Sequence, residues 1–120
     1  MTRAQVPQRP AGDDPDRVLQ IGELEIYPAG LSVRMGGVKA TLPLREFEVL
    51  LVLAENVGRV IPAQALLDHA WGVGYTDNTG TLKVHVNRLR KRIKTALGVD
   101  YIRTVRGLGY SLDPELAHRS

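Results

Sequence analysis

Residues 78–98 read NTGTLKVHVNRLRKRIKTALG, and this stretch decides the fold of the chain. Its apolar residues recur at steps of four, three, four and four: Leu82, Val86, Leu89, Ile93 and Leu97. This spacing places them along one side of an α-helix. Asn78 or Thr79 is suited to begin the helix, and Gly98 is suited to end it. The stretch therefore predicts a long amphipathic helix whose apolar stripe packs against a protein core.

The other side of this helix is basic. No Asp or Glu occurs between Lys83 and Val99, so the cations lack the acidic neighbours, one turn away, that are typical of a solvated helix. The outward rows hold Lys83, Val84, Asn87, Arg88, Arg90, Lys91 and Lys94, flanked by His85 and Arg92. Arg and Lys bind phosphates or guanine, Asn binds adenine, and a small apolar residue contacts the thymine methyl group. We expect repulsion among these cations, which a phosphate backbone would relieve.

Charge is concentrated in the same part of the chain. The 120 residues carry a formal net charge of +3. Residues 83–106 hold eight of the basic residues and one acid, Asp100, whereas acids outnumber bases on both sides of that segment. The eight are Lys83, Arg88, Arg90, Lys91, Arg92, Lys94, Arg103 and Arg106. Such a segregated block is typical of a protein with a polyanionic partner.

The segments before the basic helix predict a small sheet and two shorter helices. Residues 18–42 alternate between apolar and polar positions and are interrupted by turn signals such as Gly36-Gly37, which favours three or four short antiparallel strands. The spacing becomes helical from Leu44, with Phe47, Leu50, Leu51 and Ala54 on one side. A second short helix is expected over about Ala63 to Ala70. Proline precedes both helices, so neither has a side-chain cap.

The chain ends in a predicted hairpin. Two β-type runs, YIRTV at 101–105 and YSL at 110–112, flank Arg106-Gly-Leu-Gly109. Two short helices followed by a long basic one suggest helix-turn-helix geometry, with the hairpin as a wing. Arg106 at its tip suits a narrow minor groove or a phosphate. We expect an α+β domain over residues 17–113, a disordered tail or linker over 1–16, and a C-terminal tail over 114–120.

Several other functions are disfavoured by composition. There are no cysteines, and the three histidines show neither metal-ligand nor catalytic-triad spacing. Glu46 and Glu48 are expected on a solvated face of the first helix. We therefore expect no catalysis, no cofactor and no metal. The longest uncharged apolar run, Val49 to Ala54, is far too short for a bilayer, and no secretory signal is present, which predicts a cytoplasmic protein without a membrane partner.

One alternative remains on the residues alone. A winged helix whose basic face docks an acidic protein would show the same charge pattern, and discrimination between DNA sequences would separate the two hypotheses. RNA is a weaker candidate because aromatic residues for base stacking are few.

The chain resembles the effector domain of OmpR/PhoB-type response regulators of two-component systems over about Val18 to Leu112. The matching motifs occur in order and at the right spacing: LPLREFEVLLVLAENVGRV, LLDHAWG, TLKVHVNRLRKRI and YIRTVRGLGYSL. The resemblance implies a winged helix-turn-helix with a four-stranded antiparallel sheet, three helices and a C-terminal hairpin. It also implies sequence-specific binding of double-stranded DNA in transcription regulation, as a head-to-tail pair on direct repeats, at the nucleoid.

The resemblance also implies residue roles. Arg88 matches the main base-contacting arginine, and Lys83, Val84 and Asn87 match positions that face the major groove. Positions at the DNA backbone or minor groove match Trp71, Thr81, His85, Arg90, Thr104, Arg106, Gly107 and Tyr110. Lys91, on the outward basic side of the helix, is expected to contact the DNA backbone as well. The loop that touches RNA polymerase in the family matches Val73, Gly74, Tyr75, Thr76 and Asp77.

Three departures from the family pattern are expected to matter. Gly80 replaces a common arginine, so one phosphate contact is lost. Lys83 replaces a common aspartate, which should alter the sequence preference. No receiver domain precedes residue 17, so the chain is either an excised domain or a stand-alone regulator.

Overall fold

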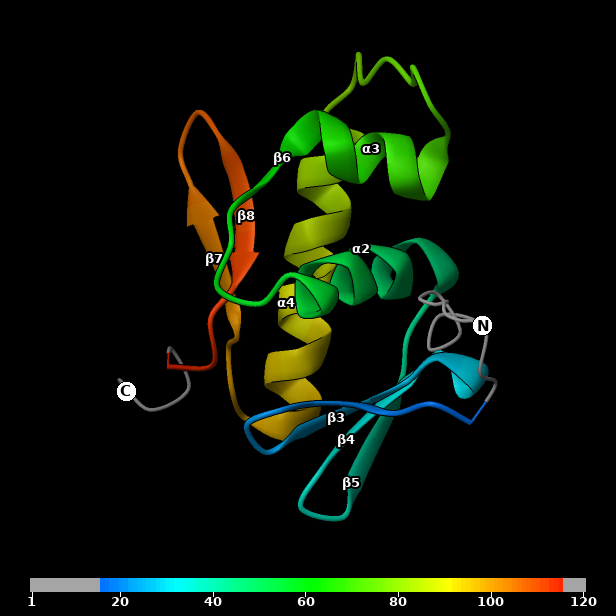
Figure 1. Cartoon of the computed structure of the whole chain (residues 1–120), viewed down its shortest axis with the longest axis vertical. Helices are drawn as coiled ribbons and strands as arrows, with labels where there is room; N and C mark the ends of the chain where they lie inside the picture. Colours follow the sequence, from blue (N-terminus) through cyan, green and yellow to red (C-terminus); the bar gives the residue numbers. More distant parts are fainter. Residues whose placement is uncertain (1–15, 116–120) are drawn as a thin grey trace, which may run out of the picture.

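The structure is a computed structural model that describes residues 16–115. Eleven elements follow one another in these residues (Figure 1): β2 (Leu19–Ile21), β3 (Leu24–Tyr27), the 3-10 turn η1 (Pro28–Gly30), β4 (Ser32–Met35), β5 (Val38–Thr41), α2 (Leu44–Glu55), β6 (Ile61–Pro62), α3 (Ala63–Trp71), α4 (Thr81–Leu97), β7 (Ile102–Val105) and β8 (Gly109–Leu112). The predicted tails at 1–15 and 116–120 lie outside the described residues, and the domain bounds 17–113 stay a prediction.

The N-terminal sheet has four antiparallel strands in the order β2-β3-β4-β5. Its register aligns Ile26 with Val33, and both are fully buried. The turn between β4 and β5 is Gly36-Gly37, and both glycines have positive φ, 56° and 88°. Positive φ at both central residues is what a tight hairpin turn requires. The expected antiparallel sheet and its glycine turn are therefore confirmed.

The three helices pack on one another between this sheet and the C-terminal hairpin. Figure 1 shows α2 crossing α4, with α3 near the N-terminal end of α4 and the sheet near its C-terminal end. From α2, Phe47, Leu50 and Leu53 enter the core, whereas Leu51 is only half-buried. The helices α2 and α3 begin after Pro43 and Pro62 without a side-chain cap, as predicted. Among the described residues, no helix combines the length and apolar content that a membrane crossing requires.

The hairpin belongs to a three-stranded sheet in the order β6-β8-β7. The sequence predicted β7 and β8 but not β6, because two residues that include a proline give no strand signal. Gly109 makes this pairing possible. A Cβ at Gly109 would overlap the Ile61 carbonyl oxygen and lie 2.9 Å from the Cα of Pro62. The wing is thereby joined through β8 to the segment that starts α3.

Two sequence predictions need correction. The long helix α4 begins at Thr81, not at Asn78 or Thr79, because Gly80 adopts a left-handed conformation with φ of 72° that interrupts the helix. Glu46 is not on a solvated face. Its side chain is 3% exposed and lies among the core residues of α2, where an arginine from α4 neutralises it.

Candidate nucleic-acid interface

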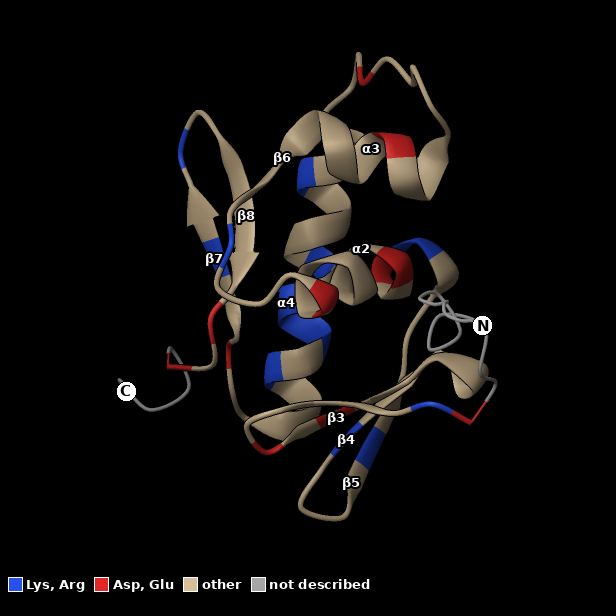
Figure 2. Ribbon diagram, viewed as in Figure 1, with Lys and Arg blue, Asp and Glu red and all other residues tan. Residues whose placement is uncertain are grey.

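Helix α4 has one buried side and one exposed cationic side. Leu82, Val86, Leu89 and Ile93 are almost inaccessible to solvent, and Leu97 is half-buried. The opposite side exposes Lys83, Val84, Asn87, Arg88, Lys91 and Lys94. Figure 2 shows Lys and Arg following α4 and continuing onto the hairpin. The predicted orientation of Asn87 and Arg88 away from the core is therefore confirmed, while their contacts stay a prediction.

The start of α4 is held by an aspartate from the preceding loop. The Asp77 carboxylate accepts the backbone N–H groups of Thr81 (2.7 Å) and Leu82 (3.1 Å). Gly80 at the cap position has no side chain to do this, so Asp77 takes its place. Hydrogen bonding, first from the Leu82 N–H, holds the pKa of Asp77 below its usual value despite partial desolvation. Asp77 thus orients the end of α4 that carries Lys83 and Val84.

Arg90 joins α4 to the wing. Its guanidinium donates to the Thr104 hydroxyl on β7 (3.1 Å) and to the Asp100 carboxylate (3.0 Å). The other Asp100 oxygen accepts the Ile102 N–H at the start of β7 (3.1 Å). Two residues predicted to contact the DNA backbone, Arg90 and Thr104, therefore lie side by side.

Arg92 forms an ion pair with the first helix. Its Nε donates to Oε1 of Glu46 at 2.8 Å, and the arginine side chain is 49% exposed whereas the carboxylate is buried. The expectation of mutually repelling cations without acidic partners is thus wrong for Arg90 and Arg92. Their acidic partners, Asp100 and Glu46, lie outside α4. The fold brings both carboxylates beside the helix, although neither is one helical turn from its arginine in the sequence.

An aromatic cluster flanks α4 on the side of Arg92. Trp71, half-buried at the end of α3, meets the His85 ring edge-on with centroids 4.9 Å apart and lies 6.0 Å from the Tyr75 ring. His85 Nδ1 donates to the Thr81 carbonyl oxygen (2.8 Å), since a carbonyl only accepts. This bond leaves His85 Nε2 for an outside partner. The Arg45 guanidinium lies 5.8 Å from the Trp71 ring centroid.

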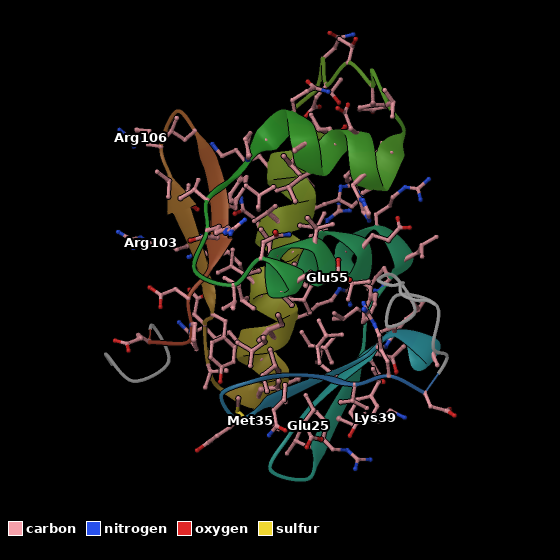
Figure 3. The ribbon with its side chains drawn as sticks, viewed as in Figure 1. Glu25, Met35, Lys39, Glu55, Arg103 and Arg106 are labelled. Atoms are coloured by element: carbon pink, nitrogen blue, oxygen red, sulfur yellow. The ribbon has the colours of Figure 1, made fainter. Side chains whose placement is uncertain are left out.

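The wing presents its tip to solvent. Figure 3 shows Arg106 at the tip and Arg103 on the side of the hairpin, both pointing away from α4. Gly107 has φ of 80°, and Leu108 is 64% exposed beside it. Tyr110 is half-buried, and its burial raises the pKa of its hydroxyl. A groove of about 500 Å³ between Lys83 and the hairpin is lined by Ala63, Lys83 and residues 104–110.

In the loop of residues 73–77, some side chains are exposed and others hold the structure together. Val73 is 94% exposed and Thr76 is exposed, but Tyr75 packs on Trp71 and Asp77 caps α4. Gly74 donates its N–H to the Asp68 carboxylate (3.0 Å), and Gln64 donates to the Tyr75 carbonyl (3.0 Å). The exposed residues of the predicted polymerase-contact loop are therefore Val73, Gly74 and Thr76.

Sequence reasoning missed the side chains that organise this interface from a distance. Arg45, Glu46 and Asp100 were not assigned to it, and only the basic residue type of Arg45 gave a signal. Within residues 16–115, no three His, Asp or Glu side chains gather into a group that could hold a metal ion.

Comparisons with known proteins agree with this arrangement. The family model described as "Transcriptional regulatory protein, C terminal" matches residues 37–112. The sensory transduction protein RegX3 of Mycobacterium leprae is 43% identical over 110 residues, which cover 88% of this chain and 56% of that protein. The chain thus spans about half the length of the curated relatives it matches.

Two solved structures share the fold. The RstA DNA-binding domain of Klebsiella pneumoniae, in complex with the RstA box, superposes with a TM-score of 0.69 and 33% identity, covering 81% of this chain and 97% of that one. DrrB of Thermotoga maritima, an OmpR/PhoB homologue, gives a TM-score of 0.67 and 33% identity over 80% of this chain and 44% of that one. The expected sheet, three helices and C-terminal hairpin are confirmed.

Proposed function

Since the chain belongs to the OmpR/PhoB-type family of C-terminal DNA-binding domains of transcriptional regulators, a family without enzymatic activity, we propose that it reads double-stranded DNA by laying α4 in the major groove. The observation that carries the proposal is the exposed, acid-free side of α4 opposite the stripe that is buried from Leu82 to Ile93. A helix anchored in this way presents side chains to base edges without moving the protein core.

Four side chains of α4 contact bases in this proposal. Arg88 pairs with guanine, Asn87 pairs with adenine, and Val84 packs on a thymine methyl group. Lys83 adds a cation at the same end of the helix, where the family usually carries an acid. All four are exposed on the described surface.

The DNA backbone contacts lie on both sides of α4. On the wing side, Arg90, Thr104 and Tyr110 hold one strand, and Arg106 with Gly107 enters the minor groove. Arg90 supports this role because its side chain, although paired with Asp100, remains one-third exposed. On the other side, Trp71, Thr81 and His85 hold the second strand. Lys91 contributes charge from the outward row of the helix.

Selection of duplexes from a random pool, followed by titration of variants, tests the proposal. Arg88→Ala should weaken binding to the selected site by about 1–3 kcal/mol and broaden the preference at one base pair. Lys91→Ala is the matched control, because loss of a phosphate contact should weaken binding to all sequences alike. If Arg88→Ala lowers affinity equally on selected and random duplexes, base readout by this residue is wrong; if no duplex is enriched from the pool, the acidic-partner alternative gains support.

We further propose that two exposed side chains of this loop, Val73 and Thr76, contact RNA polymerase, as the match to the family loop suggests. The double variant Val73→Ser, Thr76→Ser should preserve DNA affinity and reduce transcription from a target promoter in vitro. Asp77 is unsuitable for this test because it caps α4. Transcription at the wild-type level would reject the contact.

Head-to-tail binding on direct repeats is proposed on the same basis, with action at the nucleoid. The duplexes selected from the pool should contain two half-sites in tandem. A single half-site in every selected duplex would exclude the paired arrangement.

A further inference from the structure

A cationic site lies on the side of α4 that faces away from the wing. Lys83 lines the groove with the hairpin, and His85, two residues later, leaves the helix about 200° around its axis. His85 contacts Trp71, and Trp71 in turn carries the Arg45 guanidinium above its ring. The cluster therefore joins the first turn of α2, the end of α3 and the start of α4.

The Arg45 side chain contacts Trp71 and is still exposed enough to bind a partner. Its guanidinium carbon lies 5.8 Å from the Trp71 ring centroid, within the range of a cation–π contact. The only acidic partner recorded for it among the described residues is Glu48, one turn along α2, at 3.4 Å. The Arg45 side chain remains 43% exposed. By contrast, Arg92 on the same side of α4 is occupied by the buried Glu46 at 2.8 Å.

We propose that Arg45 binds a DNA phosphate on the strand that flanks α4 on the side away from the wing. This inference rests on the proposed binding of α4 in the major groove. A major groove is bordered by two DNA backbones. In the proposed arrangement, Arg90 and Thr104 contact only the backbone beside the hairpin. On the other border, the indole N–H of Trp71 is a single donor, whereas a planar guanidinium holds a phosphate by two.

The structure provides a matched control for Arg45. Arg34 on β4 also lies over an aromatic ring, with its guanidinium carbon 5.7 Å from the Tyr27 centroid. It belongs to the N-terminal sheet, whose strand β4 is separated from α4 by β5. Arg34→Gln therefore removes the same charge and the same kind of ring contact, without removing a group from the proposed interface.

The experiment measures the salt dependence of binding to the selected duplex for the full chain. Arg45→Gln should reduce the slope of log K against log salt by about one unit, because one fewer counterion is released. Arg34→Gln should leave the slope unchanged, and Arg45→Lys should keep it close to the wild-type value. Partial unfolding of a variant lowers affinity equally at all salt concentrations and leaves the slope unchanged, so a slope change is specific to the contact.

Failure of the Arg45 contact and failure of the proposed function give different results. If Arg45→Gln and Arg34→Gln give the same slope as the wild type while Arg88→Ala still broadens the preference, the Arg45 contact is wrong and the proposed function stands. If no duplex is enriched and Arg88→Ala changes nothing, the proposed function fails and the Arg45 contact fails with it.

Discussion

The ion pair between Glu46 and Arg92 should stabilise the fold rather than bind DNA. The perturbation is the set Glu46→Gln, Arg92→Gln and the double variant. Arg92→Gln leaves a carboxylate in the core, 3% exposed, without its partner at 2.8 Å. Breaking a fully buried pair in this way costs roughly 3–5 kcal/mol. Because the Arg92 side chain is 49% exposed and water reaches it, we expect about 2–3 kcal/mol.

The isosteric change Glu46→Gln should be milder, about 1–2 kcal/mol, since the amide oxygen still accepts from Arg92. The double variant should cost less than the sum of the two single changes, with a coupling free energy of about 1–2 kcal/mol. A loss of about 2–3 kcal/mol in the free energy of unfolding corresponds to a fall in Tm of roughly 10–20 °C for a domain of this size.

Urea unfolding gives these values directly. Trp71 is the only tryptophan of the chain and contacts α4 through His85, so its fluorescence reports the packing of α3 and α4. A coupling below about 0.5 kcal/mol would show that the two residues act independently and would refute the role assigned to the pair. Arg92→Gln should also leave the salt slope of DNA binding unchanged.

Two further predictions concern the elements that position α4 and the wing. The pKa of Asp77 is lowered in the folded protein, so the stability that its carboxylate contributes is present above the ordinary value of 3.8 and is lost as pH falls through the lower folded value. Asp77→Asn should therefore destabilise the protein near pH 7 and make its stability less dependent on pH in the acid range. An unchanged dependence on pH would rule out the cap. Gly109→Ala should lower the free energy of unfolding by about 1–3 kcal/mol, because the added Cβ overlaps the Ile61 backbone. Gly30→Ala is the control and should be nearly neutral, because its Cβ would lie 3.4 Å from Ser32 Oγ. Equal effects of the two variants in thermal unfolding would contradict the close approach of β6 and β8.

The elements with a strong local pattern were predictable. The stripe from Leu82 to Ile93 is buried as expected, and the Gly36-Gly37 turn joins two paired strands. The helices after Pro43 and Pro62 lie where the spacing places them. The start of α4 was misjudged because the cap comes from Asp77, three residues before Gly80, instead of from an adjacent residue. The strand β6 was missed because its two residues become a strand only by pairing with β8.

The amino-acid sequence by itself determined which residues of α4 face the core and which face outward, because that division depends only on the helical repeat. It also determined the acid-free character of the outward side and the family to which the chain belongs. Tertiary structure alone decided which cations are free for a partner. Glu46 reaches Arg92 across 46 positions, Asp100 holds Arg90, and Arg45 lies on Trp71. These contacts depend on how the helices and strands pack in space, and the spacing of residues along the chain does not reveal that packing.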